Sequence, residues 1–275
     1  LSATAQTDTV SIHSRPCFLC QTNRPQEQEF ISYRNYQILV NPYPIFKHHF
    51  TIADKEHKSQ SIVGRFKDMI EFTDIMREYF LLYNGPECGA SAPDHAHFQA
   101  CSKEESMQGS YYDHIELIDN DKVRISYEDF PYSFIRIQAK NKKTMSKTFH
   151  LIYDILAANN NGKEPMMNIL AWYGLEITKE HFRKNYDDEF ESVAEHPYNC
   201  VIFLRSKHRP DCYYAKGDEQ ILISPAIAEM NGIFPIVREE DMEKLTPEKV
   251  YDIYREVSIS KEKLQEIIER IKAAL

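Results

Sequence analysis

Apolar and polar residues alternate along several stretches of the chain, which predicts β-strands with one buried face. The run from Phe30 to Val40 is rich in Tyr, Ile and Val, and the polar pair at Arg34 and Asn35 predicts a hairpin turn within it. The prolines of the Asn41–Pro44 segment end this hairpin. Lys47 to His57 then reads as another strand that runs into a turn. The early part of the chain is therefore expected to be sheet.

Between Ser59 and Leu82 the spacing changes. Apolar residues from Ile62 to Phe80 recur with a period close to that of a helix, and charged residues lie between them. This pattern predicts one long amphipathic helix that packs on the sheet.

The second part of the chain shows a similar order of elements. We expect a helix at about Met145 to Ala158, with strands before and after it. The expected strands are Lys122 to Tyr127, Ser133 to Ala139, Met166 to Tyr173 and Asn199 to Leu204. Near the end, Thr246 and Ser260 are expected to cap two further helices.

Strands, helix and strands thus follow one another in both parts, which predicts an α+β protein with two related halves. The polar segment from Ser102 to Ser110 is the best candidate linker. We therefore divide the chain into residues 15–102 and residues 103–275. His-x-His occurs in the first half and has no counterpart in the second.

Composition limits the classes of partner. The chain has 275 residues, of which 42% are hydrophobic, enough for one large or two closely packed domains. Its formal net charge of −9 argues against a nucleic-acid partner or an anionic membrane surface, because both require a basic face. No apolar run approaches the length of a membrane span, and the first residues do not resemble a signal peptide. We therefore expect a cytoplasmic protein.

The six cysteines are unevenly spaced. Cys17 and Cys20 form a Cys-x-x-Cys pair, which indicates zinc or redox chemistry, whereas the others are scattered. The residues after Cys20 are polar and read as a loop, and a thioredoxin-like role would need a helix there. Zinc would require further ligands. The alternative is a pair of reduced thiols.

The segment His95-Ala-His-Phe-Gln99 carries the clearest chemistry. If it is a strand, His95, His97 and Gln99 project from one face, and the apolar residues between them face a core. A neutral imidazole can attack phosphorus at physiological pH. The Gly89 to Pro93 turn before this strand allows close approach of a ligand to the backbone.

At these residues the sequence resembles the histidine-triad superfamily, in particular its transferase branch with Gln in the last triad position. That branch includes galactose-1-phosphate uridylyltransferase, diadenosine tetraphosphate phosphorylase and GDP-L-galactose phosphorylase. The resemblance implies that His97 is the nucleophile and that Gln99 contacts the transferred phosphoryl group. It also implies that Asn84 and Ser91 contact phosphate. The sequence departs from the uridylyltransferase pattern by an Asp94 inserted before His95.

The same resemblance implies a structural zinc site. In the uridylyltransferase a Cys-x-x-Cys pair, the first His of His-x-His and a further His bind zinc. The matching residues in this sequence are Cys17, Cys20, His57 and His95. If no metal binds, His57 is a solvated turn residue.

The later part of the chain resembles the dinucleotide and GDP-L-galactose phosphorylases, at His196 to Arg205 and at Glu229 to Gly232. Arg205, Lys207 and Arg209 form a local basic cluster. Arg205 and Arg209 are candidate phosphate contacts, and a solvated loop face is the alternative.

These inferences predict a nucleotidyltransferase. It acts on a nucleoside diphosphate sugar through a nucleotidyl-histidine and passes the nucleotide to phosphate or a sugar 1-phosphate. The alternatives are a dinucleoside polyphosphate phosphorylase or hydrolase, and a catalytically inactive nucleotide-sugar-binding protein. The resemblance further suggests a homodimer.

Overall fold

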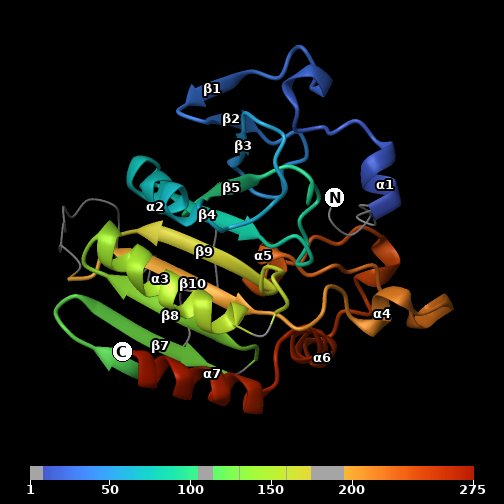
Figure 1. Cartoon of the computed structure of the whole chain (residues 1–275). Coiled ribbons are helices and arrows are strands. Elements are labelled where there is room, and N and C mark those ends of the chain that lie inside the picture. Colours follow the sequence, from blue (N-terminus) through green and yellow to red (C-terminus); the bar gives the residue numbers. More distant parts are fainter. Residues whose placement is uncertain (1–8, 105–113, 130, 159, 175–194) are drawn as a thin grey trace, which may run out of the picture.

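The computed structural model describes residues 9–104, 114–129, 131–158, 160–174 and 195–275 (Figure 1). Its strands are β1 Phe30–Tyr33, β2 Tyr36–Val40, β3 His49–Asp54, β4 Tyr79–Asn84, β5 His97–Ser102, β6 Ile115–Asp119, β7 Val123–Glu128, β8 Phe134–Ala139, β9 Met167–Tyr173 and β10 Tyr198–Leu204. Its α-helices are α1 Thr9–Ser14, α2 Phe66–Ile75, α3 Lys142–Ala157, α4 Asp211–Tyr214, α5 Ile227–Met230, α6 Pro247–Val257 and α7 Lys261–Ala274. Short 3₁₀ helices cover Gln21–Asn23, Gly217–Glu219 and Glu239–Asp241. None of the described helices is long and apolar enough to cross a membrane.

In the described part of the chain, ten strands form one antiparallel sheet in the order β1-β2-β3-β5-β4-β9-β10-β8-β7-β6. Read inward from either edge, both halves have the same topology: three sequential strands, then the fifth, then the fourth. A helix joins the third strand to the fourth in each half, α2 in one and α3 in the other. The halves meet where β4 pairs with β9. This repeated topology confirms the prediction of an α+β protein with two related halves.

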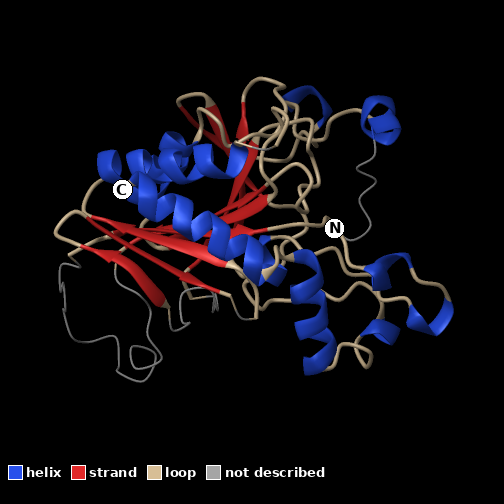
Figure 2. Cartoon of the chain, turned by 60° about the horizontal axis from the view of Figure 1, so that its bottom comes forward, coloured by secondary structure: helices blue, strands red, loops and turns tan. Residues whose placement is uncertain are grey.

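The central strands of the sheet are buried on both faces. The long helices α2, α3 and α7 lie along one face (Figures 1 and 2). In that layer the rings of Phe66 and Phe149 stack with centroids 3.5 Å apart and link α2 to α3. A second core on the opposite face gathers side chains of β4, β9 and β10 against α5 and α6. Alternate residues of β4 accordingly face opposite cores, Leu81 one and Leu82 the other.

The prediction of one long helix from Ser59 to Leu82 was wrong. Helix α2 ends at Ile75, and after a turn the chain continues as strand β4 from Tyr79. Because β4 has a core on each side, its sequence is an unbroken apolar run without the alternation that marks a half-exposed strand. Periodicity alone does not distinguish such a run from a buried helix segment.

Other local predictions were confirmed. The hairpin turns at Arg34, whose φ is 48°. The Thr246 hydroxyl accepts from the Lys249 amide at the start of α6, and the Ser260 hydroxyl accepts from the Lys263 amide at the start of α7. The expected strands and helix of the second half are present within a few residues, whereas strand β6 was not predicted. Residues 105–110 of the proposed linker lie outside the described residues, and the division at residues 102 and 103 stays a prediction.

Candidate active site

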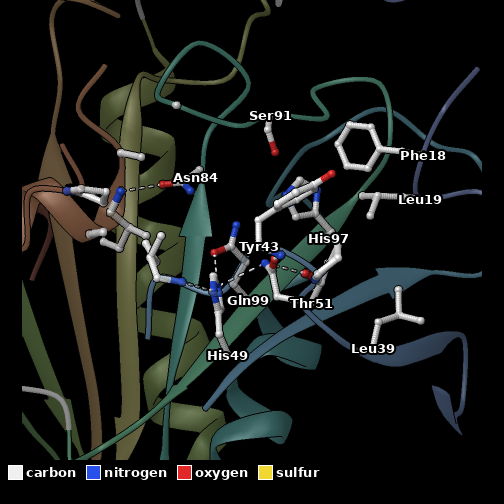
Figure 3. A pocket seen from close by; sticks show the side chains of 18 of the residues that line it. Phe18, Leu19, Leu39, Tyr43, His49, Thr51, Asn84, Ser91, His97 and Gln99 are labelled. Carbon is white, nitrogen blue, oxygen red and sulfur yellow. Dashed lines mark hydrogen bonds between the residues drawn. The ribbon is translucent and has the colours of Figure 1, made fainter. Parts of the chain in front are cut away.

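A pocket of about 740 Å³ opens on the α5 face of the sheet (Figure 3). Its floor includes His97 and Gln99 from β5, with Asn84 at the end of β4. The N-terminal segment and the residues after β2 line one side, and the α5 segment lines another. Phe18, Leu19, Leu39 and Tyr43 contribute apolar surface to it. Segments that are distant in the sequence therefore meet around His97, the predicted nucleophile.

The ring of His97 has a defined orientation. Its Nδ1 lies 2.8 Å from the backbone oxygen of His95, and because a carbonyl can only accept, Nδ1 carries the proton. Nε2 then bears the lone pair, and no described group forms a hydrogen bond with it. Burial lowers the pKa of His97 to about 4, which keeps the ring neutral at physiological pH. The pocket thus contains a neutral imidazole with an available lone pair.

His95 differs from the expectation that three side chains would share one strand face. Strand β5 begins at His97, and His95 belongs to the preceding turn. Its Nε2 lies 2.8 Å from the Asp54 carbonyl, so Nε2 is the donor and Nδ1 carries the lone pair. This Nδ1 lies 3.3 Å from the sulfur of Cys17 and not in the pocket.

The predicted metal ligands lie together in space. One ligand atom from each of Cys17, Cys20, His57 and His95 falls within a group whose members are all within 4.8 Å of one another. Cys20 Sγ is 3.3 Å from Nδ1 of His57 and 3.6 Å from Nδ1 of His95. Zinc–sulfur and zinc–nitrogen bonds of about 2.3 and 2.0 Å at tetrahedral angles give an S···N edge of about 3.5 Å. The donor set therefore fits a metal ion of this size.

The amide of Asn84 is held by residues of the second half. Its Oδ1 accepts from Asn168 Nδ2 at 2.7 Å and from the Ile227 amide at 2.8 Å. Because these two donors occupy the oxygen, the NH₂ group of Asn84 is available to a ligand in the pocket. Figure 3 shows the Asn84 nitrogen on the side away from the dashed hydrogen bond.

The loop between Asn84 and His95 lines the pocket at Gly89 and Ser91. Gly89 has φ of 88°, and a Cβ there would lie 2.5 Å from the Cβ of Ala226, so this position requires glycine. The inserted Asp94 forms an ion pair with Arg15 at 3.0 Å, and Arg15 also reaches the Ser91 carbonyl at 3.4 Å. The insertion therefore ties the N-terminal segment to the Ser91 loop.

Arg205 and Arg209 lie outside the residues that line the pocket. The Arg205 guanidinium is buried, and it donates to Asn168 Oδ1 at 2.6 Å and to several backbone carbonyls. Arg209 donates to the Ser224 hydroxyl at 3.0 Å and lies over the ring of Tyr213. This placement does not support direct phosphate contact by either arginine. Arg205 instead holds Asn168, which holds Asn84.

Sequence reasoning missed part of the pocket. It did not connect the Ala226–Glu229 wall or Asn168 with the predicted histidines. In the structure His49 Nε2 lies 2.8 Å from Gln99 Oε1. The available signal was a buried Asn168 within an otherwise apolar strand, since such an amide requires partners.

Comparisons with known proteins agree with this fold. A family model described as a domain of unknown function (DUF4922) matches residues 1–102. No curated protein matches the chain. The crystal structure of yeast Ap4A phosphorylase Apa2 superposes with a TM-score of 0.60 at 13% identity, covering 91% of this chain and 83% of that chain.

The same yeast enzyme in complex with Ap4A gives a TM-score of 0.55 at 14% identity, covering 90% of this chain and 81% of that chain. An ADP-glucose phosphorylase from Arabidopsis thaliana with bound ADP-glucose gives a TM-score of 0.41 at 14% identity, covering 90% of this chain and 94% of that chain. The superpositions on the yeast Ap4A phosphorylase agree with the fold that the sequence resemblance implied. In particular, it shares the fold of the yeast Ap4A phosphorylase.

Proposed function

We propose that this protein is a nucleotidyltransferase that acts on a nucleoside diphosphate sugar through a covalent nucleotidyl-histidine. The observation that carries the proposal is the His97 ring, neutral and with the lone pair of Nε2 available in the pocket. A buried histidine in a purely structural role normally uses both ring nitrogens. Here one nitrogen is fixed by a carbonyl and the other is available.

In the proposed reaction, Nε2 of His97 attacks the α-phosphorus. A P–N bond forms as the bond to the bridging oxygen breaks, and the sugar 1-phosphate leaves with the electron pair. The oxygen of phosphate, or of another sugar 1-phosphate, then attacks the same phosphorus and restores the imidazole. The His95 carbonyl stabilises the positive charge that develops on the ring.

Neutral donors would bind the non-bridging oxygens of the transferred group. The NH₂ group of Asn84 is available for this because its Oδ1 is occupied by other donors. Ser91 and Gln99 line the same pocket. Such preorganised donors stabilise charge that grows in the transition state.

The charge of the pocket supports a substrate with few phosphates. Among the described residues that line it, Arg15 is the sole Lys or Arg, and its guanidinium is paired with Asp94. A nucleoside diphosphate sugar carries about two negative charges on its diphosphate, whereas a dinucleoside tetraphosphate carries about twice as many. Neutral donors favour the former.

The Cys17, Cys20, His57 and His95 set would hold zinc in a structural role. All four positions are protein ligands, so a tetrahedral ion would have no open position for substrate. Zinc would fix the N-terminal segment, which forms part of the pocket, against the turn that precedes His97.

The test is incubation of the purified protein with a panel of nucleotide sugars and Ap4A, each with and without phosphate. We expect an acid-labile nucleotidyl-protein adduct from a nucleotide sugar alone, and a nucleoside diphosphate once phosphate is added. An adduct from Ap4A alone would instead indicate a dinucleoside polyphosphate phosphorylase. Tight nucleotide binding with neither adduct nor turnover would contradict an enzymatic function and indicate a catalytically inactive nucleotide-sugar-binding protein.

A further inference from the structure

The orientation of the Gln99 amide is set by one neighbour. An amide side chain can present either its oxygen or its NH₂ group to a ligand, so a residue that contacts phosphate must be held in one orientation. In this structure Gln99 Oε1 lies 2.8 Å from Nε2 of His49. The two side chains come from the neighbouring strands β5 and β3, where Gln99 lies opposite Thr51.

The tautomer of His49 follows from its other nitrogen. The backbone amide of Ile45 points at Nδ1 with an N···N distance of 3.4 Å. Because a backbone N–H can only donate, Nδ1 carries the lone pair and Nε2 carries the proton. Nε2 therefore donates to Gln99 Oε1.

A further polar contact of this ring is with Asn41, whose Nδ2 lies 3.4 Å from Nε2 of His49. Asn41 Oδ1 accepts from the Tyr43 amide and its Nδ2 donates to the Thr51 hydroxyl at 3.2 Å, so its amide is satisfied elsewhere. If His49 instead accepted at Nε2, its Nδ1 proton would face the Ile45 N–H. The backbone contact decides between the tautomers.

We propose that His49 is a positioning residue, which donates to Gln99 Oε1 and thereby presents the Gln99 NH₂ group to the phosphoryl group. Figure 3 shows the Gln99 nitrogen on the side away from His49, toward Asn84 and Ser91. The His49 ring is itself held, because the edge-on ring of Phe46 has its centroid 5.0 Å away. His49 and Asn168 thus act alike, each occupying the oxygen of a pocket amide. This inference rests on the proposed function for its effect on catalysis, whereas the tautomer does not depend on any activity.

The first test is nitrogen NMR of the ligand-free protein with ¹⁵N-labelled histidine. We expect His49 as the neutral tautomer protonated at Nε2. A resonance pattern for protonation at Nδ1 overturns the proposal, whether or not the protein turns over a nucleotide sugar.

The second test compares three variants in single-turnover adduct formation with a nucleotide sugar of that panel that forms an adduct with the wild type. His49→Phe should slow adduct formation about tenfold to a hundredfold. This is the effect of losing, in the transition state, the hydrogen bond between the Gln99 NH₂ group and the charged phosphoryl group. His49→Gln retains an NH₂ donor and should recover most of the rate. His48→Phe alters the neighbouring exposed histidine and should leave the rate unchanged.

Equal rates for His49→Phe and His48→Phe would overturn the proposal, as would failure of His49→Gln to exceed His49→Phe. Circular dichroism of each variant identifies a loss of fold. If His49→Phe does not fold, the comparison of His49→Gln with the wild type and the NMR result still decide.

Discussion

The backbone carbonyl of His95 accepts a hydrogen bond from Nδ1 of His97 at 2.8 Å, while the ring of His95 faces Cys17 and Cys20. One residue therefore contributes its side chain to the candidate metal cluster and its backbone to the candidate nucleophile. A change in the cluster is expected to act on His97 through the orientation of its ring.

The metal prediction concerns Cys20. Purified protein should contain close to one equivalent of zinc, and Cys20→Ser should lose it and unfold at lower temperature, because metal binding contributes to folding. Elemental analysis and thermal unfolding with and without a chelator measure both effects. Cys212→Ser, which removes a buried thiol outside the cluster, should keep the metal. Wild-type protein without metal would refute the zinc site.

The nucleophile prediction concerns His97. His97→Gly should abolish adduct formation, a loss of more than about a thousandfold, because this ring provides the attacking nitrogen. The fold should be retained, since His97 lines a pocket and lies outside both large cores. His95→Asn should first lower the metal content. Mass spectrometry of the protein after incubation with substrate distinguishes the two, and an adduct on His97→Gly would rule out the mechanism.

The acceptor prediction concerns Gln99. Gln99→His places a titratable group beside the phosphorus, which can pass a proton to or from water. The rate of phosphorolysis should fall, and the rate at which water hydrolyses the adduct should rise relative to the rate of phosphorolysis. The ratio of nucleoside monophosphate to nucleoside diphosphate, followed over time with phosphate present, measures this change. An unchanged ratio would show that Gln99 does not select the acceptor.

Asn168 provides a test of the pocket wall. Asn168→Asp keeps an oxygen toward Arg205 but removes the NH₂ group that donates to Asn84 Oδ1 and to the Cys88 carbonyl, both at 2.7 Å. We expect a loss of about 1–3 kcal/mol in the free energy of unfolding, and weaker nucleotide binding because Asn84 can then rotate. Urea unfolding and calorimetric titration measure the two effects.

The matched control is Asn160→Asp, which removes an NH₂ group that donates to the Lys163 and Glu164 carbonyls away from the pocket. It should affect stability alone. If Asn168→Asp binds nucleotide as the wild type does while Asn84→Ala does not, the proposed coupling between the two amides is wrong.

A pH prediction follows from Glu229, which is buried beside the pocket. Burial raises the pKa of this carboxyl from its usual 4.5 to about 7, although the Ala226 amide and Arg205 favour the charged form. A raised carboxyl pKa gives stability that is complete below about pH 4.5 and is lost as the pH rises through 7. Glu229 should therefore lower the melting temperature across this range.

Glu229→Gln should remove that part of the pH dependence, which is on the order of 3 kcal/mol. The exposed Glu219→Gln serves as the control and should retain it. The measurement is thermal unfolding at several pH values between 4 and 8, and parallel curves for wild type and Glu229→Gln would contradict the assignment.

The local parts of this site were predictable from sequence, whereas its assembly was not. The placement of His97 and Gln99 on one strand face follows from strand alternation, and the four candidate metal ligands follow from a family pattern. Arg205 has the residue type of a phosphate ligand, but its burial beneath Asn168 depends on packing between β9, β10 and the segment before α5. The strand β4 was misread because burial on both faces removes the signal on which the assignment relied.

The walls of the pocket also determine when it forms during synthesis. His97 and Gln99 leave the ribosome well before Ala226, Pro235 and Val237, which complete the opposite wall. The α5 amide that fixes Asn84 emerges equally late. A nascent chain thus exposes its histidine strand before the residues that complete the pocket have been synthesised.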